Sequence, residues 1–88
     1  MTEPQSSAET DTPGLVFYTT AGCHLCEYAA EMLEYLQRES GLIVQEVDIS
    51  SAEELVERYG IRIPVVKNPV SEEELGWPFS MEQLASLV

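Results

Sequence analysis

The pattern of apolar and polar positions divides the chain after Gly14 into short strands and helices. Residues 15–20 (LVFYTT) are rich in β-branched and aromatic side chains and follow Pro13-Gly14, which is typical of a buried strand. From Cys23 the apolar positions recur every three or four residues, which predicts a helix that ends at Gly41. Its expected apolar stripe comprises Leu25, Cys26, Ala29, Ala30, Met32, Leu33 and Leu36.

A second strand and a short second helix are expected next. The strand covers residues 42–49 and places Ile43, Val47 and Ile49 on one face. Residues 50–54 (SSAEE) contain two overlapping capping boxes, so a helix should begin there and end at Gly60. Its apolar positions are Leu55, Val56 and Tyr59.

The last third of the chain predicts two strands and a helix. Residues 61–66 are apolar except for Arg62, although Pro64 interrupts them, and residues 73–77 form an expected edge strand. Ser80, with Gln83 three residues later, should cap a final helix. That helix would bury Met81, Leu84 and Leu87.

These elements give the order β-α-β-α-β-β-α. Since a helix joins the first two strands, they should be parallel with a right-handed crossover, while the last two strands are close enough for an antiparallel hairpin. The sequence therefore predicts an α/β fold with a four-stranded mixed sheet and helices on both faces. A chain of 88 residues fits one domain, placed at residues 14–88, and the polar, acidic residues 1–13 are expected to form a disordered tail.

The charge of the chain excludes some classes of partner. It has 16 acidic and 4 basic residues and a net charge of −12, which opposes binding to nucleic acid and to anionic lipid. The residues after Met1 include neither a basic region nor an apolar run, and no segment approaches the roughly 20 apolar residues that span a bilayer. We expect a monomeric, cytoplasmic protein that contacts neither nucleic acid nor membrane.

The residues with the clearest chemistry are Cys23 and Cys26, a C-x-x-C pair. The pair follows a predicted strand, crosses a glycine turn and opens a helix, which is the context of a redox dithiol. Zinc sites use the same spacing but need four ligands, and this chain has two cysteines and one histidine. A metal site would require carboxylates or a second molecule. Redox chemistry, metal binding and inert thiols are the alternatives, and no resident metal or cofactor is expected.

Position in the helix favours Cys23 as the nucleophile. Only the thiolate attacks a disulfide, and the unpaired N–H groups at a helix N-terminus stabilise it. Cys26 lies one turn further on the apolar stripe, so it should be more buried and act as the resolving thiol. His24 would favour the thiolate if protonated, whereas Glu27 would oppose it. A solvent-exposed His24 without a role is the alternative.

The dipeptide Ile63-Pro64 is a second candidate for the site. A proline within an apolar, strand-like run is unexpected because it cannot donate to the sheet. A cis bond beside the dithiol would turn the preceding backbone groups outward, where they could pair with an extended substrate. An ordinary trans proline at the start of a strand is equally compatible with the residues alone.

Taken together, residues 18–26 (YTTAGCHLC), 47–49 (VDI), 60–65 (GIRIPV) and 75–79 (LGWPF) resemble the thioredoxin superfamily, and most closely short bacterial glutaredoxin-like proteins. The resemblance implies a thioredoxin fold, Cys23 as nucleophile, Cys26 as resolving thiol and Pro64 in the cis form. It also implies glutathione, as a co-substrate, or a protein disulfide as partner, with Arg62, Ile63 and Pro64 binding the substrate. An interaction domain that keeps the fold without catalysis is the remaining alternative.

The chain departs from dithiol glutaredoxins at four points, one of which is Gly76-Trp77-Pro78-Phe79 in place of their Gly-Gly-Asp segment near the last helix. His24-Leu25 stands where glutaredoxins typically carry Pro-Tyr, and Thr20 stands where they often carry a lysine that grips glutathione. Arg62-Ile63-Pro64 replaces Thr-Val-Pro. Because glutathione is anionic and Arg62 and Lys67 are the only basic residues expected near the site, these departures concern glutathione binding rather than the fold.

Overall fold

The computed structural model describes residues 14–88, so the tail predicted for residues 1–13 lies outside the described residues. The predicted fold class is confirmed, with one added 3-10 turn, η1. Among the described residues, no helix has the length and apolar character that crossing a membrane requires. The elements are β1 (Gly14–Thr19), α2 (His24–Ser40), β2 (Ile43–Asp48), η1 (Ile49–Ser51), α3 (Glu53–Tyr59), β3 (Val65–Lys67), β4 (Glu74–Gly76) and α4 (Met81–Leu87).

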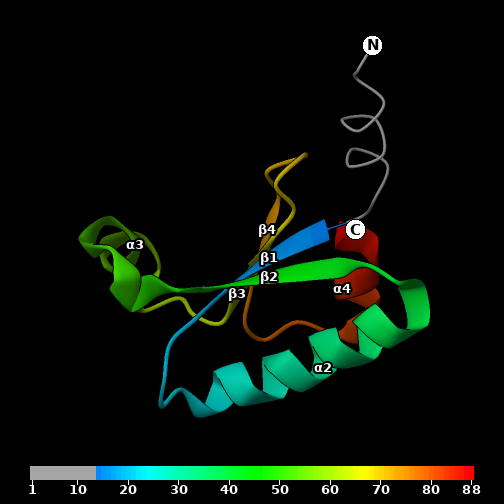
Figure 1. Ribbon diagram of the computed structural model, residues 1–88, viewed down its shortest axis with the longest axis horizontal. Coiled ribbons are helices and arrows are strands. Elements are labelled where there is room, and N and C mark those ends of the chain that lie inside the picture. Colours follow the sequence, from blue (N-terminus) through cyan, green and yellow to red (C-terminus); the bar gives the residue numbers. More distant parts are fainter. Residues whose placement is uncertain (1–13) are drawn as a thin grey trace.

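The sheet has four strands in the order β2-β1-β3-β4. β1 pairs in parallel with β2 and antiparallel with β3, and β3 pairs antiparallel with β4, as the connections predicted. In this register Thr19 lies opposite Asp48, so the carboxyl ends of β1 and β2 meet at one end of the sheet. Figure 1 shows this end on the left, where β1 leads into the loop before α2.

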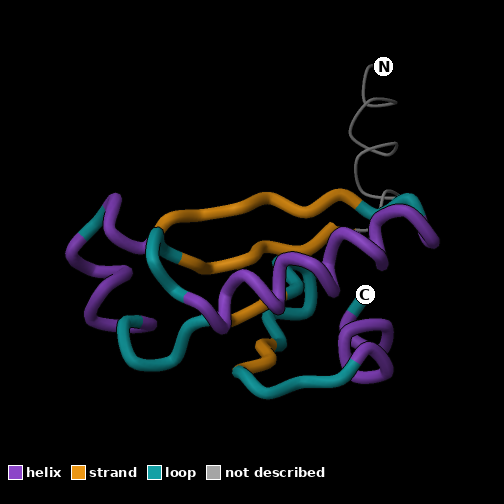
Figure 2. Tube along the Cα trace, turned by 90° about the horizontal axis from the view of Figure 1, so that it is seen from below, coloured by secondary structure: helices purple, strands orange, loops and turns teal. Residues whose placement is uncertain are grey.

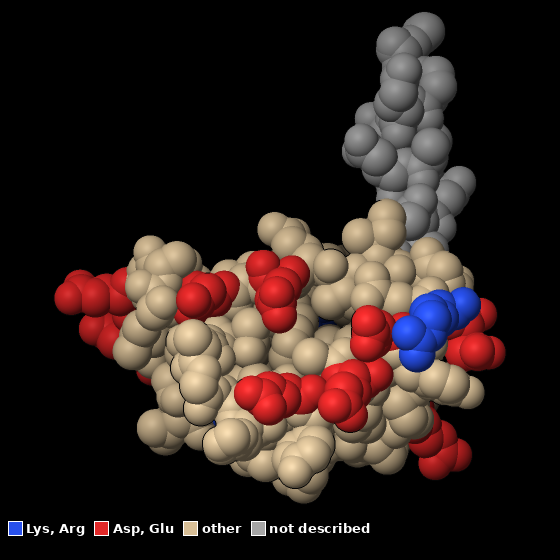
Figure 3. Space-filling view, turned by 60° about the horizontal axis from the view of Figure 1, so that its bottom comes forward, with Lys and Arg blue, Asp and Glu red and all other residues tan. Residues whose placement is uncertain are grey.

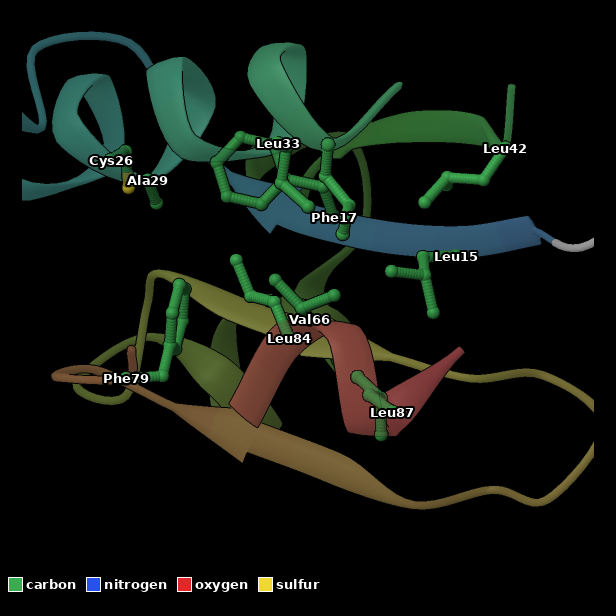
Figure 4. Close-up of a cluster of buried hydrophobic side chains, with 11 residues drawn as sticks. Leu15, Phe17, Cys26, Ala29, Leu33, Leu42, Val66, Phe79, Leu84 and Leu87 are labelled. Carbon is green, nitrogen blue, oxygen red and sulfur yellow. The ribbon is translucent and has the colours of Figure 1, made fainter. Parts of the chain in front are cut away.

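The main core lies between the sheet and the pair α2 and α4. In Figure 1 α2 lies below the strands and α4 lies at their right-hand end, and Figure 2 shows α2 lying across the strands. Figure 4 shows Phe17 and Leu33 with Val66 and Leu84 in this cluster. Fully burying a leucine or phenylalanine stabilises the fold by about 1.5–3 kcal/mol, so this cluster anchors α2 to the sheet. Its buried members are Leu15, Phe17, Cys26, Ala29, Leu33, Leu36, Leu42, Val66, Phe79, Leu84 and Leu87.

A smaller core on the opposite face of the sheet holds α3. It consists of Ile49, Tyr59 and Val65, and the ring of Tyr59 stacks on Tyr18 with the ring centroids 4.2 Å apart. Successive strand residues point to opposite faces, so Val65 enters this core while Val66 enters the main one. The two clusters explain why helices are needed on both faces.

Two helix ends follow the sequence signals closely. Gly41 ends α2 in the left-handed conformation with φ 75°, and its N–H donates to the carbonyl of Gln37 at 2.8 Å. At α4, Ser80 Oγ accepts from the N–H of Gln83, whose side chain accepts from the N–H of Ser80. The predicted end of α2 at Gly41 and the predicted cap of α4 by Ser80 are therefore confirmed. Each depends only on residues close to it in the sequence.

The predicted start of α3 was wrong. Neither Ser50 nor Ser51 caps it, because Ala52 is the N-cap and makes no side-chain hydrogen bond. The N–H and hydroxyl of Ser50 instead donate to the Asp48 carboxylate, at 2.9 and 2.8 Å. With these hydrogen bonds Asp48 becomes the N-cap of η1, so β2 ends at Asp48 and the next three residues form η1.

Several expected core positions are exposed. Ile43 is 60% exposed because β2 is an edge strand. Ile49 is buried as expected, but it lies beyond the strand in η1 rather than on the same strand face. Leu25 and Val56 are also exposed, at 45% and 46%. Leu25 lies at the margin of the α2 stripe, and the seven-residue α3 buries only part of its surface.

Candidate active site

The loop between β1 and α2 brings Cys23 to the start of the helix. Gly22 makes the turn with φ 81°, a left-handed conformation that glycine adopts without strain. Cys23 is the N-cap of α2, and its Sγ accepts a hydrogen bond from the backbone N–H of Cys26 at 3.2 Å. The sulfurs of Cys23 and Cys26 are joined as a disulfide, with the two Cα atoms 5.2 Å apart.

The two sulfurs differ in exposure. Cys26 is 3% exposed and belongs to the main core, as predicted, whereas Cys23 is only partly buried at its margin. A partner approaching from solvent therefore meets Cys23 first. The N–H of Cys26 is aimed at the Cys23 sulfur, where it would stabilise negative charge on a thiolate.

His24 lies in solvent beside the dithiol. Its Nδ1 is 3.9 Å from Oε1 of Glu27, and the two side chains are 89% and 71% exposed. Pairs this exposed contribute little free energy because water and salt screen them. The modulating role given to His24 stays a prediction.

The peptide bond between Ile63 and Pro64 is cis. Pro64 is fully buried, and its carbonyl accepts from the N–H of Trp77 at 3.2 Å. The N–H of Ile63 donates to the carbonyl of Tyr59 at 3.0 Å, so only the carbonyl of Ile63 remains for an extended substrate. The side chains of Ile63 and Cys23 both pack against the main core.

Arg62 has a partner within the protein. Its guanidinium donates to Oε1 of Glu74 at 2.9 Å and lies 5.3 Å from the centre of the Tyr59 ring. The Tyr59 hydroxyl donates to Oε2 of the same carboxylate at 2.7 Å. Burial, followed by the adjacent Glu74 carboxylate, raises the pKa of Tyr59 far above its ordinary value. The substrate-binding role of Arg62 stays a prediction, and one nitrogen of its guanidinium is already paired with Glu74.

The sequence of the whole described domain matches one known protein family. The model of the glutaredoxin-like domain family (DUF836) matches residues 14–88, which includes every described element. The chain belongs to this family. No curated protein matches it.

Two solved structures resemble this glutaredoxin-like domain. The crystal structure of protein XcR50 from X. campestris is 36% identical in sequence and has a TM-score of 0.68. The aligned region covers 82% of this chain and 91% of the XcR50 chain. The solution structure of protein Ne2328 from Nitrosomonas europaea is 28% identical in sequence and has a TM-score of 0.73. The aligned region covers 86% of this chain and 91% of the Ne2328 chain. Both agree with a glutaredoxin-like fold for the chain.

A hollow beside the disulfide of the glutaredoxin-like domain was not anticipated from the sequence. It has a volume of about 220 Å³ and lies between the loop before Cys23, the first turns of α2, and Glu46 of β2. The Thr20 hydroxyl donates to Oδ1 of Asp48 at 3.1 Å, which ties that loop to the end of β2. The parallel pairing of the first two strands could have located this contact, because it brings their carboxyl ends together.

Asp48 is held in its charged form at this end of the sheet. The Asp48 carboxylate accepts hydrogen bonds from the N–H and hydroxyl of Ser50 and from the hydroxyl of Thr20. These bonds outweigh the effect of burial and lower the pKa of Asp48. Among residues 14–88, no group of three or more His, Cys, Asp or Glu side chains is arranged to hold a metal ion.

Proposed function

We propose that this protein is a thiol–disulfide oxidoreductase in which Cys23 is the nucleophile and Cys26 the resolving thiol. The observation that carries the proposal is the cap of α2. There, a partly exposed sulfur accepts the N–H of a buried cysteine that is also its disulfide partner. The family match supports a redox role, and the proposal extends it to catalysis.

The reaction begins from the reduced protein. The Cys23 thiolate attacks one sulfur of a substrate disulfide, a Cys23–substrate bond forms, and the other substrate sulfur leaves as a thiolate that takes up a proton. Cys26 then loses its proton and attacks the Cys23 sulfur, which releases the second substrate thiol. Two electrons pass from the dithiol to the substrate, and a thiol reductant such as glutathione regenerates the protein by the reverse exchange.

The proposed substrates are glutathione or protein disulfides, and the protein would act as a cytoplasmic monomer. The carbonyl of Ile63 offers one hydrogen-bond acceptor to a bound peptide, and the buried Pro64 ring fixes the backbone beside it. This acceptor supports an extended substrate, whose backbone N–H groups can donate.

Equilibration in redox buffers tests the proposal. Purified protein is brought to equilibrium with reduced and oxidised dithiothreitol or glutathione, quenched with an alkylating agent and analysed by mass. We expect a reversible two-electron transition between dithiol and disulfide. Turnover of a protein disulfide should then be lost in Cys23→Ser, and Cys26→Ser should accumulate the mixed disulfide with substrate.

The matched variants decide between roles for the two sulfurs. Mixed disulfide on Cys26 in Cys23→Ser at the wild-type rate would contradict the assignment of the nucleophile. A protein that forms no reversible disulfide, or that binds metal or an iron–sulfur cluster through Cys23 between two copies, would overturn the proposal as a whole.

A further inference from the structure

A groove runs along the seam between α2 and the edge strand β2, and the disulfide lies at one end of it. Three adjoining hollows form it, with volumes of about 220, 310 and 320 Å³, and Glu46 lines all three. We call this feature the α2–β2 groove. Its floor is apolar and is formed by the partly buried side chains of Ala30 and Val44, which lie over the buried core residues Phe17 and Leu33.

The rim of the groove is acidic. Carboxylates line it on both sides, from Glu27, Glu31 and Glu34 of α2 and from Glu46 and Asp48 of β2. The four basic residues of the chain are Arg38, Arg58, Arg62 and Lys67, and none of them lines these hollows. Figure 3 shows carboxylates spread over the face that carries α2, with basic side chains confined to one end.

The two basic residues expected near the dithiol do not offset this charge. Arg62 is paired with Glu74 at 2.9 Å. Lys67 lies opposite Val16 in the sheet, three positions before Thr19, and so away from the end of β1 that leads to Cys23. Hydrogen bonds keep Asp48 ionised, so negative charge persists at the end of the groove nearest the disulfide.

We propose that the α2–β2 groove binds a basic, extended segment of a partner protein and guides that segment's disulfide to Cys23. The inference rests on the proposed exchange reaction and specifies its substrate class. Apolar side chains of the segment would cover the floor, and lysine or arginine side chains would pair with the carboxylates of the rim. Glutathione carries net negative charge and is disfavoured by the same rim, as is a second copy of this acidic chain.

Kinetics with charged probes test the proposal. The reduced protein is mixed with two synthetic peptide disulfides of identical core sequence, one flanked by lysines and one by glutamates, and the formation of protein disulfide is followed. At low ionic strength we expect the lysine peptide to react at least about tenfold faster, because complementary charge raises the local concentration of substrate and its on-rate by 10–10³-fold. The ratio should shrink in about 0.5 M salt, which screens charges beyond a few ångströms.

Two variants with the same net charge locate the effect. Glu31→Gln/Glu34→Gln/Glu46→Gln removes charge from the groove and should bring the ratio of the two rates close to one. The control, Glu57→Gln/Glu72→Gln/Glu73→Gln, removes equal charge from exposed positions elsewhere and should keep most of the wild-type ratio. Folding of both variants is verified by circular dichroism.

The outcomes separate this inference from the proposed function. If the protein cycles reversibly but the two peptides react equally fast, or if both triple variants lower the ratio alike, the groove is not the recognition surface. Faster reaction with glutathione disulfide than with the lysine peptide would also overturn the inference. If no peptide or redox buffer oxidises the dithiol, the proposed function itself fails.

Discussion

The hydroxyl of Tyr59 donates a 2.7 Å hydrogen bond to Glu74, a residue fifteen positions later that also accepts from Arg62. This carboxylate therefore joins the end of α3 and the residue before Ile63 to the edge strand β4. Tyr59 is 2% exposed and its ring stacks on Tyr18. The hydrogen bond from Tyr59 to Glu74 therefore lies at the edge of the smaller core and holds the Tyr59 side chain in place.

Tyr59→Phe should destabilise the fold while keeping the stacked ring. The substitution removes a hydrogen bond to a charged, partly buried carboxylate, for which we expect a loss of about 1.5–3 kcal/mol in the free energy of unfolding. Urea denaturation measures it. Tyr28→Phe is the control, because Tyr28 is 59% exposed and its substitution should change stability by less than about 0.5 kcal/mol. Equal effects of the two substitutions would contradict the assigned role of Tyr59.

The Glu74 carboxylate should make stability depend on pH in the acidic range. Burial acts to raise the pKa of Glu74, but hydrogen bonds from Tyr59 and Arg62 and the charges of Arg62 and Lys67 outweigh it and lower the pKa. A group with a lower pKa in the folded state stabilises it above the unfolded pKa, about 4.3 for glutamate, and loses this effect as pH falls through the folded value.

The measurement is urea unfolding of wild type and Glu74→Gln from neutral pH down into the acidic range. We expect the variant to be less stable at pH 7 and the difference between the two proteins to shrink as the carboxylate becomes protonated. A difference that stays constant or grows on acidification would mean that the charge of Glu74 does not contribute.

Gly41→Ala should weaken the end of α2. Gly41 has φ 75°, and nothing lies within 4 Å of an added Cβ, so the cost is backbone strain rather than a clash. We expect about 1–2 kcal/mol lower stability on denaturation, and a smaller loss for Gly41→Asn. Gly76→Ala is the control, since Gly76 has the same free space without a left-handed φ. A loss at Gly76 as large as at Gly41 would refute this explanation.

Ser80→Ala and Ser51→Ala should differ although both serines precede a short helix. Ser80 closes a capping box at α4, so its loss should cost about 0.5–2 kcal/mol. Ser51 makes no cap at α3, and its replacement should be nearly neutral. Thermal unfolding of both variants checks the contrast, which would be absent if the sequence motif alone determined capping.

The order of elements, the glycine stop at Gly41 and the cap by Ser80 could be predicted because each depends on residues close in sequence. The position of Cys23 at a helix start followed for the same reason. The capping boxes at Ser50 and Ser51 failed because Asp48, two residues before Ser50, competes for its N–H and hydroxyl. A capping box therefore does not form where a nearby acceptor already binds the groups of the capping serine.

Features that depend on the sheet order could not be read from the chain. Ile43 is exposed because β2 lies at the edge, and the apolar pattern is the same for an edge strand as for a central one. The bond between Tyr59 and Glu74 and the acidic rim around Glu46 join residues with no regular spacing. Such contacts arise only once the strands are paired.

The presence of two separate cores implies two parts of unequal strength within one small domain. α2 has 17 residues and four buried side chains, whereas α3 has 7 residues and buries only Tyr59. Local opening should therefore begin at α3 and the loop that follows it, leaving the helix under the sulfurs intact. The two sulfurs are therefore carried by the part of the domain that stays folded during such opening, since Cys26 belongs to the main core and Cys23 packs against it.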